Sequence, residues 1–276
     1  MEKIDRLGWA AGISFTSYGV RVGVRVNTPA ALRLIESYFP PGWKPSPARV
    51  VERLYSFVLG SDGTEVPRGV RRFNLLYRDL ARLARTRDVE EALEMFETDL
   101  QLHVATEARR RVFVHAGVVG WKGRAIIIPG RSYTGKTTMV AELVKAGATY
   151  YSDEYAVLDE RGRVHPFARP LQIREAGTRR QQRFPVKTLG GKAGVKPLPV
   201  GLVVATRYKS GARWRPQQLS AGRGVLELLS QTVSARNQPG KAFAALQRVA
   251  TRALVLKGTR GEAEGLASTL LNYLDD

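Results

Sequence analysis

The chain of 276 residues contains no cysteine, only three histidines and far fewer acidic than basic side chains. The absence of cysteine excludes disulfide scaffolds, thiolate zinc sites and cysteine nucleophiles, and it fits a reducing compartment. No apolar run reaches the roughly 18 residues of a membrane-spanning helix. The opening MEKIDRLGWAAG lacks the apolar stretch of a signal peptide. We therefore expect a soluble, cytoplasmic protein with no membrane contact.

The shortage of acidic side chains is greatest in the second half of the chain. Lysine and arginine total 44 against 25 aspartates and glutamates, a formal net charge of +19. Residues 161–220 carry 14 of the basic side chains and one acid, Glu175. Such a block suits a phosphate-bearing ligand, an acidic partner or nucleic acid, and it equally suits an arginine-rich surface that only faces water. Because no nucleic-acid-binding motif accompanies the charge, nucleic acid is not an expected partner.

Hydrophobic patterning changes near residues 108–112, and this predicts two parts. The elements expected in the first part are a β-hairpin at 12–26, helices at 29–39 and 88–109, and strands at 50–59 and 69–77. From Val112 onward the strands are short and almost wholly apolar, as in a sheet covered on both faces. The elements expected there are strands at 112–121, 124–128, 200–208 and 252–258, a strand ending at Tyr151, helices at 136–146, 221–232, 240–251 and 260–275, and long loops at 160–200. We predict a small α+β module at 1–110 followed by an α/β domain at 111–276.

The strongest local signal is the glycine loop, residues 130–137, which reads GRSYTGKT and matches G-x-x-x-x-G-K-[ST] throughout. An apolar strand precedes this loop and an amphipathic helix follows it. In that context backbone N–H groups and the helix dipole favour a bound phosphate. Lys136 can reach the β- and γ-phosphates, and the Thr137 hydroxyl can ligate Mg²⁺. The residues expected to bind nucleotide are Gly130, Ser132, Thr134, Gly135, Lys136, Thr137 and Thr138.

Two further features lie near this loop in the sequence. Ser152-Asp153-Glu154 stands at the end of an apolar strand, where adjacent carboxylates point to opposite faces. One carboxylate is then well placed to hold Mg²⁺, and the other to accept a proton from an attacking hydroxyl. An acidic pair in a surface turn is the alternative interpretation. His115 lies on an apolar strand fifteen residues before Gly130, a position that also suits a simple core histidine.

His115-Ala116, the glycine loop and Asp153-Glu154 together resemble the catalytic domain of HPr kinase/phosphorylase. The resemblance is closest to the HPr-kinase-related serine kinases and covers residues 112–172 best. It implies a P-loop kinase domain of the HPr kinase/phosphoenolpyruvate-carboxykinase-like type. Gln172-Ile173-Arg174-Glu175 departs from the family signature Glu-Ile-Arg-Gly, which argues against HPr itself as the substrate and against phosphorolysis.

The resemblance also implies roles for individual residues. Lys136 and Thr137 would bind nucleotide phosphates and Mg²⁺, Asp153 would be the general base, and Glu154 a metal-linked acid. His115 would pack near the transferred phosphate. The expected catalytic residues are thus Asp153, His115 and Lys136, and the expected metal ligands are Thr137, Glu154 and Asp153. By analogy with the family, a homo-oligomer is expected.

These observations favour an ATP- and Mg²⁺-dependent kinase that phosphorylates a serine or threonine hydroxyl of a protein or peptide. The basic block is expected to steer an acidic acceptor and to supply an arginine near the phosphates. The candidates for that arginine are Arg169, Arg174, Arg179 and Arg180. Together with Arg183, they are expected to open onto the cleft that contains Gly135 and Asp153. A small-molecule hydroxyl kinase and a non-catalytic nucleotide-sensing module are the alternatives. A nucleic-acid-binding ATPase is a more distant one.

Overall fold

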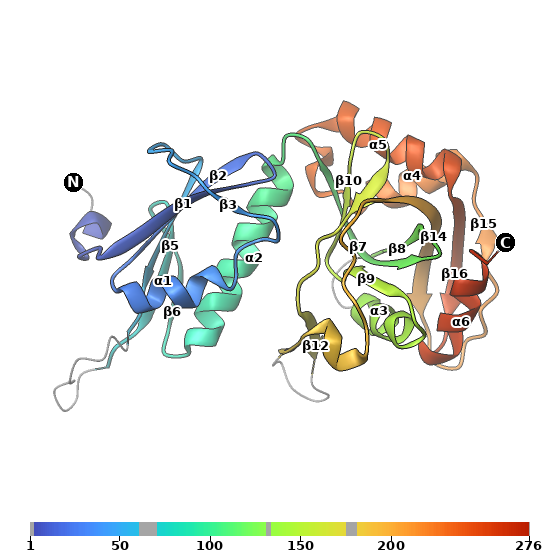
Figure 1. Cartoon of the computed structure of the whole chain (residues 1–276), viewed down its shortest axis with the longest axis horizontal. Helices are drawn as coiled ribbons and strands as arrows, with labels where there is room; N and C mark the ends of the chain where they lie inside the picture. Colours follow the sequence, from blue (N-terminus) through green and yellow to red (C-terminus); the bar gives the residue numbers. More distant parts are fainter. Residues whose placement is uncertain (1–2, 61–70, 131–133, 175–180, 276) are drawn as a thin grey trace. The chain divides into compact units, whose positions relative to one another are not determined.

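The computed structural model describes residues 3–60, 71–130, 134–174 and 181–275 of the chain. The chain forms two compact units, Met1–Arg109 and Arg110–Asp276, and each contains both helices and β-sheet (Figure 1). The protein is therefore of mixed α/β class. The division lies one residue from the boundary that the sequence predicts at 110/111.

The first unit is built around a six-stranded sheet in the order β3-β1-β2-β4-β5-β6. Its elements are η1 (Lys3–Arg6), β1 (Ala11–Ser17), β2 (Val20–Val26), α1 (Pro29–Glu36), β3 (Lys44–Pro45), β4 (Arg53–Val58), β5 (Asn74–Arg78), β6 (Ala81–Thr86) and α2 (Val89–Glu107). The alternate valines of β2 are buried in the same core as Ile35 of α1 and Phe96 of α2. Both helices therefore cover one face of this sheet.

Local sequence explains where the first elements of this unit begin and turn. β1 and β2 pair antiparallel across Tyr18-Gly19, whose φ angles are 50° and 86°. Two positive φ values are what a tight hairpin turn requires, so the hairpin predicted at 12–26 is confirmed. Helix α1 begins with Pro29 after Thr28, whose hydroxyl accepts a hydrogen bond from the amide of Ala30 (3.1 Å). Residues 69 and 70 of the strand predicted at 69–77 lie outside the described residues, and the strand itself begins later, at Asn74. Strand β6 was not expected.

The second unit holds an eight-stranded sheet in the order β11-β10-β7-β8-β14-β16-β15, with β9 paired to β7. Its strands are β7 (Val112–Trp121), β8 (Arg124–Pro129), β9 (Thr149–Ser152), β10 (Tyr155–Leu158), β11 (Arg163–His165), β14 (Leu198–Tyr208), β15 (Gln217–Gln218) and β16 (Leu254–Arg260). Strand β11 pairs with both β10 and β14, so β11, β10, β7, β8 and β14 form a closed ring. Strands β8, β14 and β16 are parallel, and their carboxyl ends share one edge.

Helices cover both faces of this sheet, as its apolar strands predict. Along β8, Ile126 and Ile128 pack in the core that contains α3 (Lys136–Lys145) and α6 (Glu264–Asn272). Ile127 packs in the opposite core, with α4 (Ala221–Leu229) and α5 (Pro239–Arg252). The two helix pairs lie on opposite sides of the strands in Figure 1.

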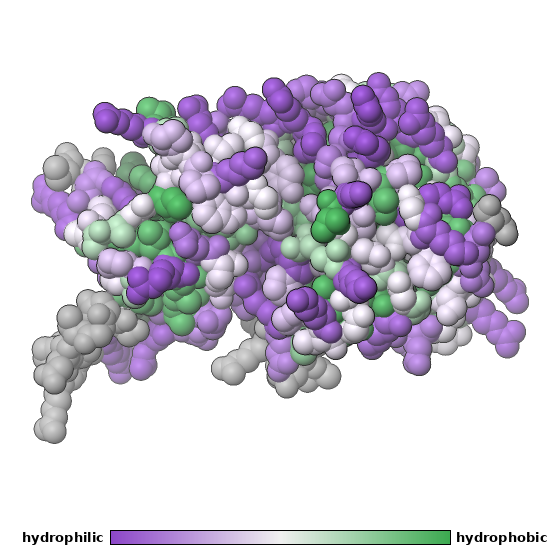
Figure 2. Space-filling model, viewed as in Figure 1, coloured by the Kyte–Doolittle hydropathy of each residue, from purple (hydrophilic) through white to green (hydrophobic). Residues whose placement is uncertain are grey.

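Helix α5 is amphipathic, with one buried apolar face and one exposed polar face. Ala242, Leu246 and Val249 are buried, whereas Lys241 and Arg248 are exposed. In Figure 2 hydrophilic side chains line the edge of the molecule where Figure 1 places α5. In the part of the chain that the structure describes, no helix has both the length and the apolarity needed to cross a membrane.

The prediction of loops at 160–200 is wrong in part. Besides β11, this segment contains the two-stranded sheet of β12 (Leu171–Arg174) and β13 (Gln181–Phe184), followed by η2 (Val186–Leu189). A further 3₁₀ turn, η3 (Val233–Ala235), separates α4 from α5. The glycines and prolines here separate short extended segments, and the sequence between them is too short for a clear periodicity.

Candidate functional site

The glycine loop connects β8 to α3, the strand–loop–helix context that the motif needs. Gly135 is the residue before α3 and adopts φ 78°, a left-handed conformation that glycine allows without strain. As the N-cap residue of α3, Gly135 has no side chain that could cap the first turn. The amide groups of this turn therefore lie at a helix end where an anion is favoured. Ser132 lies outside the described residues.

Gly130 begins the glycine loop at a position that has no room for a side chain. A Cβ atom at Gly130 would lie 2.8 Å from the Thr134 hydroxyl oxygen, nearer than a carbon atom can come without displacement. The amide of Gly130 donates a hydrogen bond to the carbonyl oxygen of His115 (3.1 Å). The loop therefore begins against the strand that carries His115.

Lys136 is the first residue of α3, and only 7% of it is exposed. Burial lowers the pKa of its ammonium group, and the carboxylates of Glu154 and Asp153 act in the opposite direction. Thr137 follows as a half-buried residue and Thr138 is exposed. The two acids identified in the sequence thus act electrostatically on the lysine of the motif.

The acidic pair occupies the two-residue link between β9 and β10, and is not on a strand as the sequence suggested. Asp153 is 8% exposed. Its Oδ1 accepts a hydrogen bond from the Tyr150 hydroxyl (2.9 Å), and its Oδ2 lies 3.4 Å from the Thr137 hydroxyl oxygen. The amide of Gln172 also points to Oδ2 (3.4 Å). The contact between Asp153 and Thr137 joins the acidic pair directly to the glycine loop.

The environment of Asp153 raises its pKa to about 6. Burial is the main cause, and the hydrogen bond from Tyr150 opposes it. The charge of Glu154 raises the pKa further. A carboxyl group in this range can exchange a proton near neutral pH, which is the property of a general acid or base.

Glu154 faces His115 and not Thr137. Its Oε1 lies 3.4 Å from Nδ1 of His115, and both side chains are about one-third exposed. The imidazole ring of His115 packs against the ring of Tyr155 at 4.7 Å between centroids. The amide of Ala116 donates to the carbonyl of Glu154 (3.1 Å). His115 is therefore a neighbour of both the acidic pair and the glycine loop, and its place beside a transferred phosphate stays a prediction.

The sheet explains why these distant residues meet. Strands β8 and β9 both pair antiparallel with β7, so both end at the same edge. The glycine loop follows β8 there, and Asp153 follows β9. The carboxyl ends of the parallel strands β8, β14 and β16 lie at this edge too.

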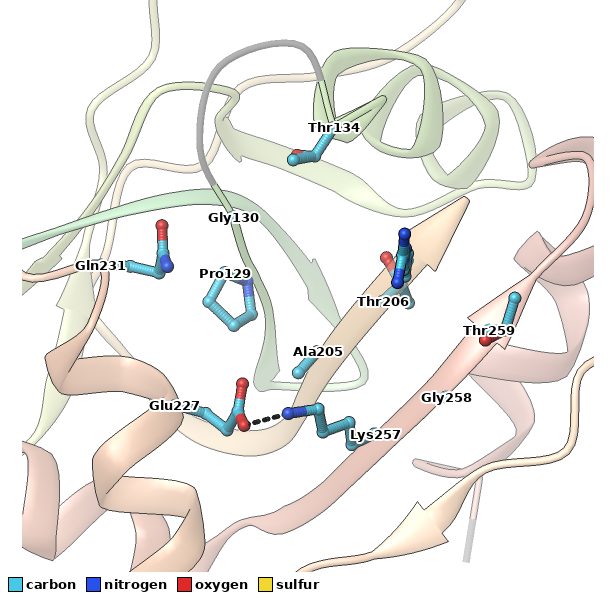
Figure 3. Close-up of a pocket in the computed structure, with 11 residues that line it drawn as sticks. Pro129, Gly130, Thr134, Ala205, Thr206, Glu227, Gln231, Lys257, Gly258 and Thr259 are labelled. Carbon is cyan, nitrogen blue, oxygen red and sulfur yellow. Dashed lines mark hydrogen bonds and ion pairs between the residues drawn. The ribbon is translucent and has the colours of Figure 1, made fainter. Parts of the chain in front are cut away.

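A cleft of about 400 Å³ adjoins the loop at the same edge (Figure 3). Its lining residues are Pro129, Gly130, Thr134, Ala205, Thr206, Arg207, Glu227, Gln231, Lys257, Gly258 and Thr259. Two of these residues, Lys257 and Glu227, form an ion pair. The part of the cleft formed by β14, β16 and α4 could not be predicted from the sequence, because isolated polar residues on strands match no motif.

The arginines expected to face the phosphates are only partly described. Arg179 and Arg180 lie outside the described residues, as does the side chain of Arg174. A backbone hydrogen bond from Arg169 reaches the Tyr150 hydroxyl, which places Arg169 near Asp153. Burial, with the charge of Arg183 as a second cause, lowers the pKa of Arg169 to about 9. Neither Arg169 nor Arg183 lines the cleft of Figure 3, and the steering of an acidic acceptor stays a prediction.

The oxygen atoms near the glycine loop suit a magnesium ion, which needs only one or two protein ligands. They suit less well a metal ion whose ligands all come from the protein. Among the described residues, no group of three or more histidine and acidic side chains is arranged to hold a metal. Magnesium commonly takes one or two protein oxygens and completes its shell with water and phosphate. The Thr137 hydroxyl and the Asp153 carboxylate supply such a pair.

Comparison with protein-family models gives no match for the chain, and a search among curated proteins finds no similar one. The kinase resemblance therefore depends on the residues described above.

Proposed function

We propose that the protein is an ATP- and Mg²⁺-dependent phosphotransferase of the HPr-kinase-like type, with a P-loop kinase domain after its N-terminal α+β unit. It would transfer the γ-phosphoryl group to a serine or threonine hydroxyl of a protein or peptide. The observation that carries the proposal is the contact between Thr137 and Asp153. It joins a complete phosphate-binding motif to a buried carboxylate of raised pKa.

The chemistry of such a site is mainly positioning and charge neutralisation. The acceptor hydroxyl oxygen forms a bond to the γ-phosphorus, and the bond from phosphorus to the β–γ bridging oxygen breaks. The nucleoside diphosphate leaves with that electron pair, and the hydroxyl proton passes to the Asp153 carboxylate. Lys136 neutralises phosphate charge at the start of α3.

Thr137 and Asp153 are the residues that would hold Mg²⁺, which supplies positive charge to the phosphate oxygens when bound. Glu154 does not contact Thr137, but it lies beside His115. It therefore suits an electrostatic role toward Lys136, whose pKa it raises. Because the cleft in Figure 3 begins at Gly130, a ligand whose phosphates occupy the loop can extend into it.

Calorimetry with ATP·Mg tests the nucleotide site. Lys136→Met should weaken binding by about 1.5–3 kcal/mol, the usual value of a charge-assisted contact. Lys145→Met is the matched control, since Lys145 lies in the last turn of the same helix and pairs with Glu142. Equal affinity of the wild type and Lys136→Met would exclude the proposed site.

Incubation with γ-labelled ATP and the native lysate tests transfer. Label on a protein or peptide supports the proposal, whereas label on free serine or another small hydroxyl compound indicates the small-molecule kinase. Nucleotide binding without any labelled product would favour the nucleotide-sensing module.

A further inference from the structure

Arg260 is a buried arginine at the end of β16, and its guanidinium group contacts the glycine loop. Only 3% of the residue is exposed. Nη2 donates to the carbonyl oxygens of Gly135 (3.1 Å) and Thr134 (3.4 Å), and Nη1 donates to that of Gly261 (3.0 Å). Arg260 thus connects the strand edge with the last two residues before α3.

Within the described residues no carboxylate forms an ion pair with this buried charge, and the charge of Glu262 acts on it only without direct contact. Nε of Arg260 is buried and has no hydrogen-bond partner among them. The guanidinium carbon lies 5.4 Å from the centre of the Tyr208 ring. Glu262 is exposed, and its carboxylate accepts the Tyr208 hydroxyl hydrogen bond (2.7 Å). A buried cation that no carboxylate contacts is costly, so the position favours an anion that comes from outside the chain.

The guanidinium group of Arg260 occupies the space that a side chain at position 135 would need. A Cβ atom at Gly135 would lie 2.5 Å from Nη2 of Arg260, so a larger residue would displace the guanidinium group. The carbonyl and the N–H of a trans peptide point in opposite directions. By holding the carbonyls of Thr134 and Gly135, Arg260 turns the N–H groups of Gly135 and Lys136 away from itself. These two amides belong to the motif that binds phosphate.

We propose that Arg260 is a positioning residue for the polyphosphate chain of a nucleoside triphosphate: it orients the amides of the glycine loop and places a buried positive charge beside them. This inference rests on the proposed nucleotide site and adds a residue far from the motif in sequence. The arginine block at 161–220, where the phosphate-facing arginine was expected, does not include it.

Calorimetry with ATP·Mg, ADP·Mg and adenosine on Arg260→Met and Arg260→Lys tests the inference. Arg260→Met should weaken ATP binding about 10- to 100-fold, the range expected when a charge-assisted contact is lost. Adenosine binding should change far less, because adenosine carries no phosphate. Arg260→Lys should recover part of the ATP affinity, since lysine keeps the charge and loses the planar fork.

Arg124→Met is the matched control. Arg124 is also a partly buried arginine that donates to a backbone carbonyl, that of Leu274 (2.8 Å), but it lies at the opposite end of β8 from the loop. Its variant should lose stability without losing ATP affinity. Thermal unfolding without nucleotide identifies any variant that is not folded, in which case Arg260→Lys and Arg260→Gln decide the outcome. Hydrogen exchange at residues 134–140 should be faster in Arg260→Met than in Arg124→Met.

The outcomes separate the two proposals. If the wild type binds ATP and folded Arg260 variants bind it equally well, the role of Arg260 is wrong and the nucleotide site stands. An equal loss of ATP and adenosine affinity also overturns the role, because it indicates general damage to the site. A wild type that binds no triphosphate overturns the proposed function, and this inference with it.

Discussion

The hydroxyl of Tyr150 donates a hydrogen bond of 2.9 Å to Oδ1 of Asp153, and both residues are buried. This bond stabilises the charged form of Asp153 and opposes the effect of burial on its pKa. Tyr150→Phe removes the bond while it keeps the ring in the core. The pKa of Asp153 should then rise above its value of about 6. Carboxyl ¹³C chemical shifts of Asp153, followed against pH in metal-free protein, measure the change.

The same variant affects catalysis if Asp153 must be ionised. The acid limb of the transfer rate against pH should move to higher pH in Tyr150→Phe, while ATP affinity at pH 8 stays unchanged. Tyr151→Phe is the control, because the Tyr151 hydroxyl bonds to the carbonyl of Lys196 and not to Asp153. An acid limb that stays in place would show that Asp153 is not the titrating base.

The two adjacent acids should have separable roles. Asp153→Asn should keep ATP binding and lose transfer by about 10²–10⁴-fold, the usual contribution of a general base. Glu154→Gln should lose less, since Glu154 contacts His115 and not Thr137. Single-turnover transfer and calorimetry on both variants measure the difference. Near wild-type transfer in Asp153→Asn, or a larger loss in Glu154→Gln, would contradict these roles.

Much of the candidate site could be predicted because most of its residues belong to short sequence motifs. The glycine loop, which includes Lys136, and the acidic pair are each a short contiguous stretch, and apolar strands next to them indicate their place in the sheet. His115 could be placed because the strand before the loop strand is its neighbour. The contact of Thr137 with Asp153 and not with Glu154 depends on the conformation of a two-residue link, which sequence alone does not determine.

The rest of the site depends on sheet order. Arg260 and Lys257 lie about 125 residues after the loop and reach it only because β16 pairs parallel with β14 and β14 with β8. Strand β6, with the sequence ARLART, has the composition of a helix and becomes a strand through pairing with β5. Such tertiary contacts override local propensity.

Gly117 lets α3 pack closely on β7. A Cβ atom there would lie 2.5 Å from Cγ2 of Val140, a stiff β-branched side chain. Gly117→Ala should therefore lower the free energy of unfolding by about 1–3 kcal/mol, as overpacking usually does. Urea unfolding measures the loss.

A double mutant tests this cause. Val140→Ala removes the opposing methyl groups, so Gly117→Ala should cost less in that background than in the wild type. Additive effects of the two changes would show that Gly117 is needed for another reason.

Asp159 organises the turn between β10 and β11. It accepts hydrogen bonds from the amides of Arg161 and Arg163 (both 2.9 Å), from Nε of Arg163 (3.1 Å) and from Nε2 of His165 (3.0 Å). Burial alone would raise the pKa of Asp159. The hydrogen bonds from Arg163 and His165 outweigh burial and lower the pKa to about 2, from its ordinary 3.8.

A lowered pKa means that the charged form of Asp159 stabilises the fold. This stabilisation is complete above pH 3.8 and disappears as the pH falls through about 2. Asp159→Asn should therefore be less stable than the wild type at pH 6, and the difference should shrink between pH 4 and pH 2. Urea unfolding across this range measures it. Glu160→Gln makes the same change in net charge at the exposed neighbouring position and should leave the pH dependence unaltered. A difference between wild type and Asp159→Asn that stays constant down to pH 2 would show that the ionised carboxylate is not what stabilises this turn.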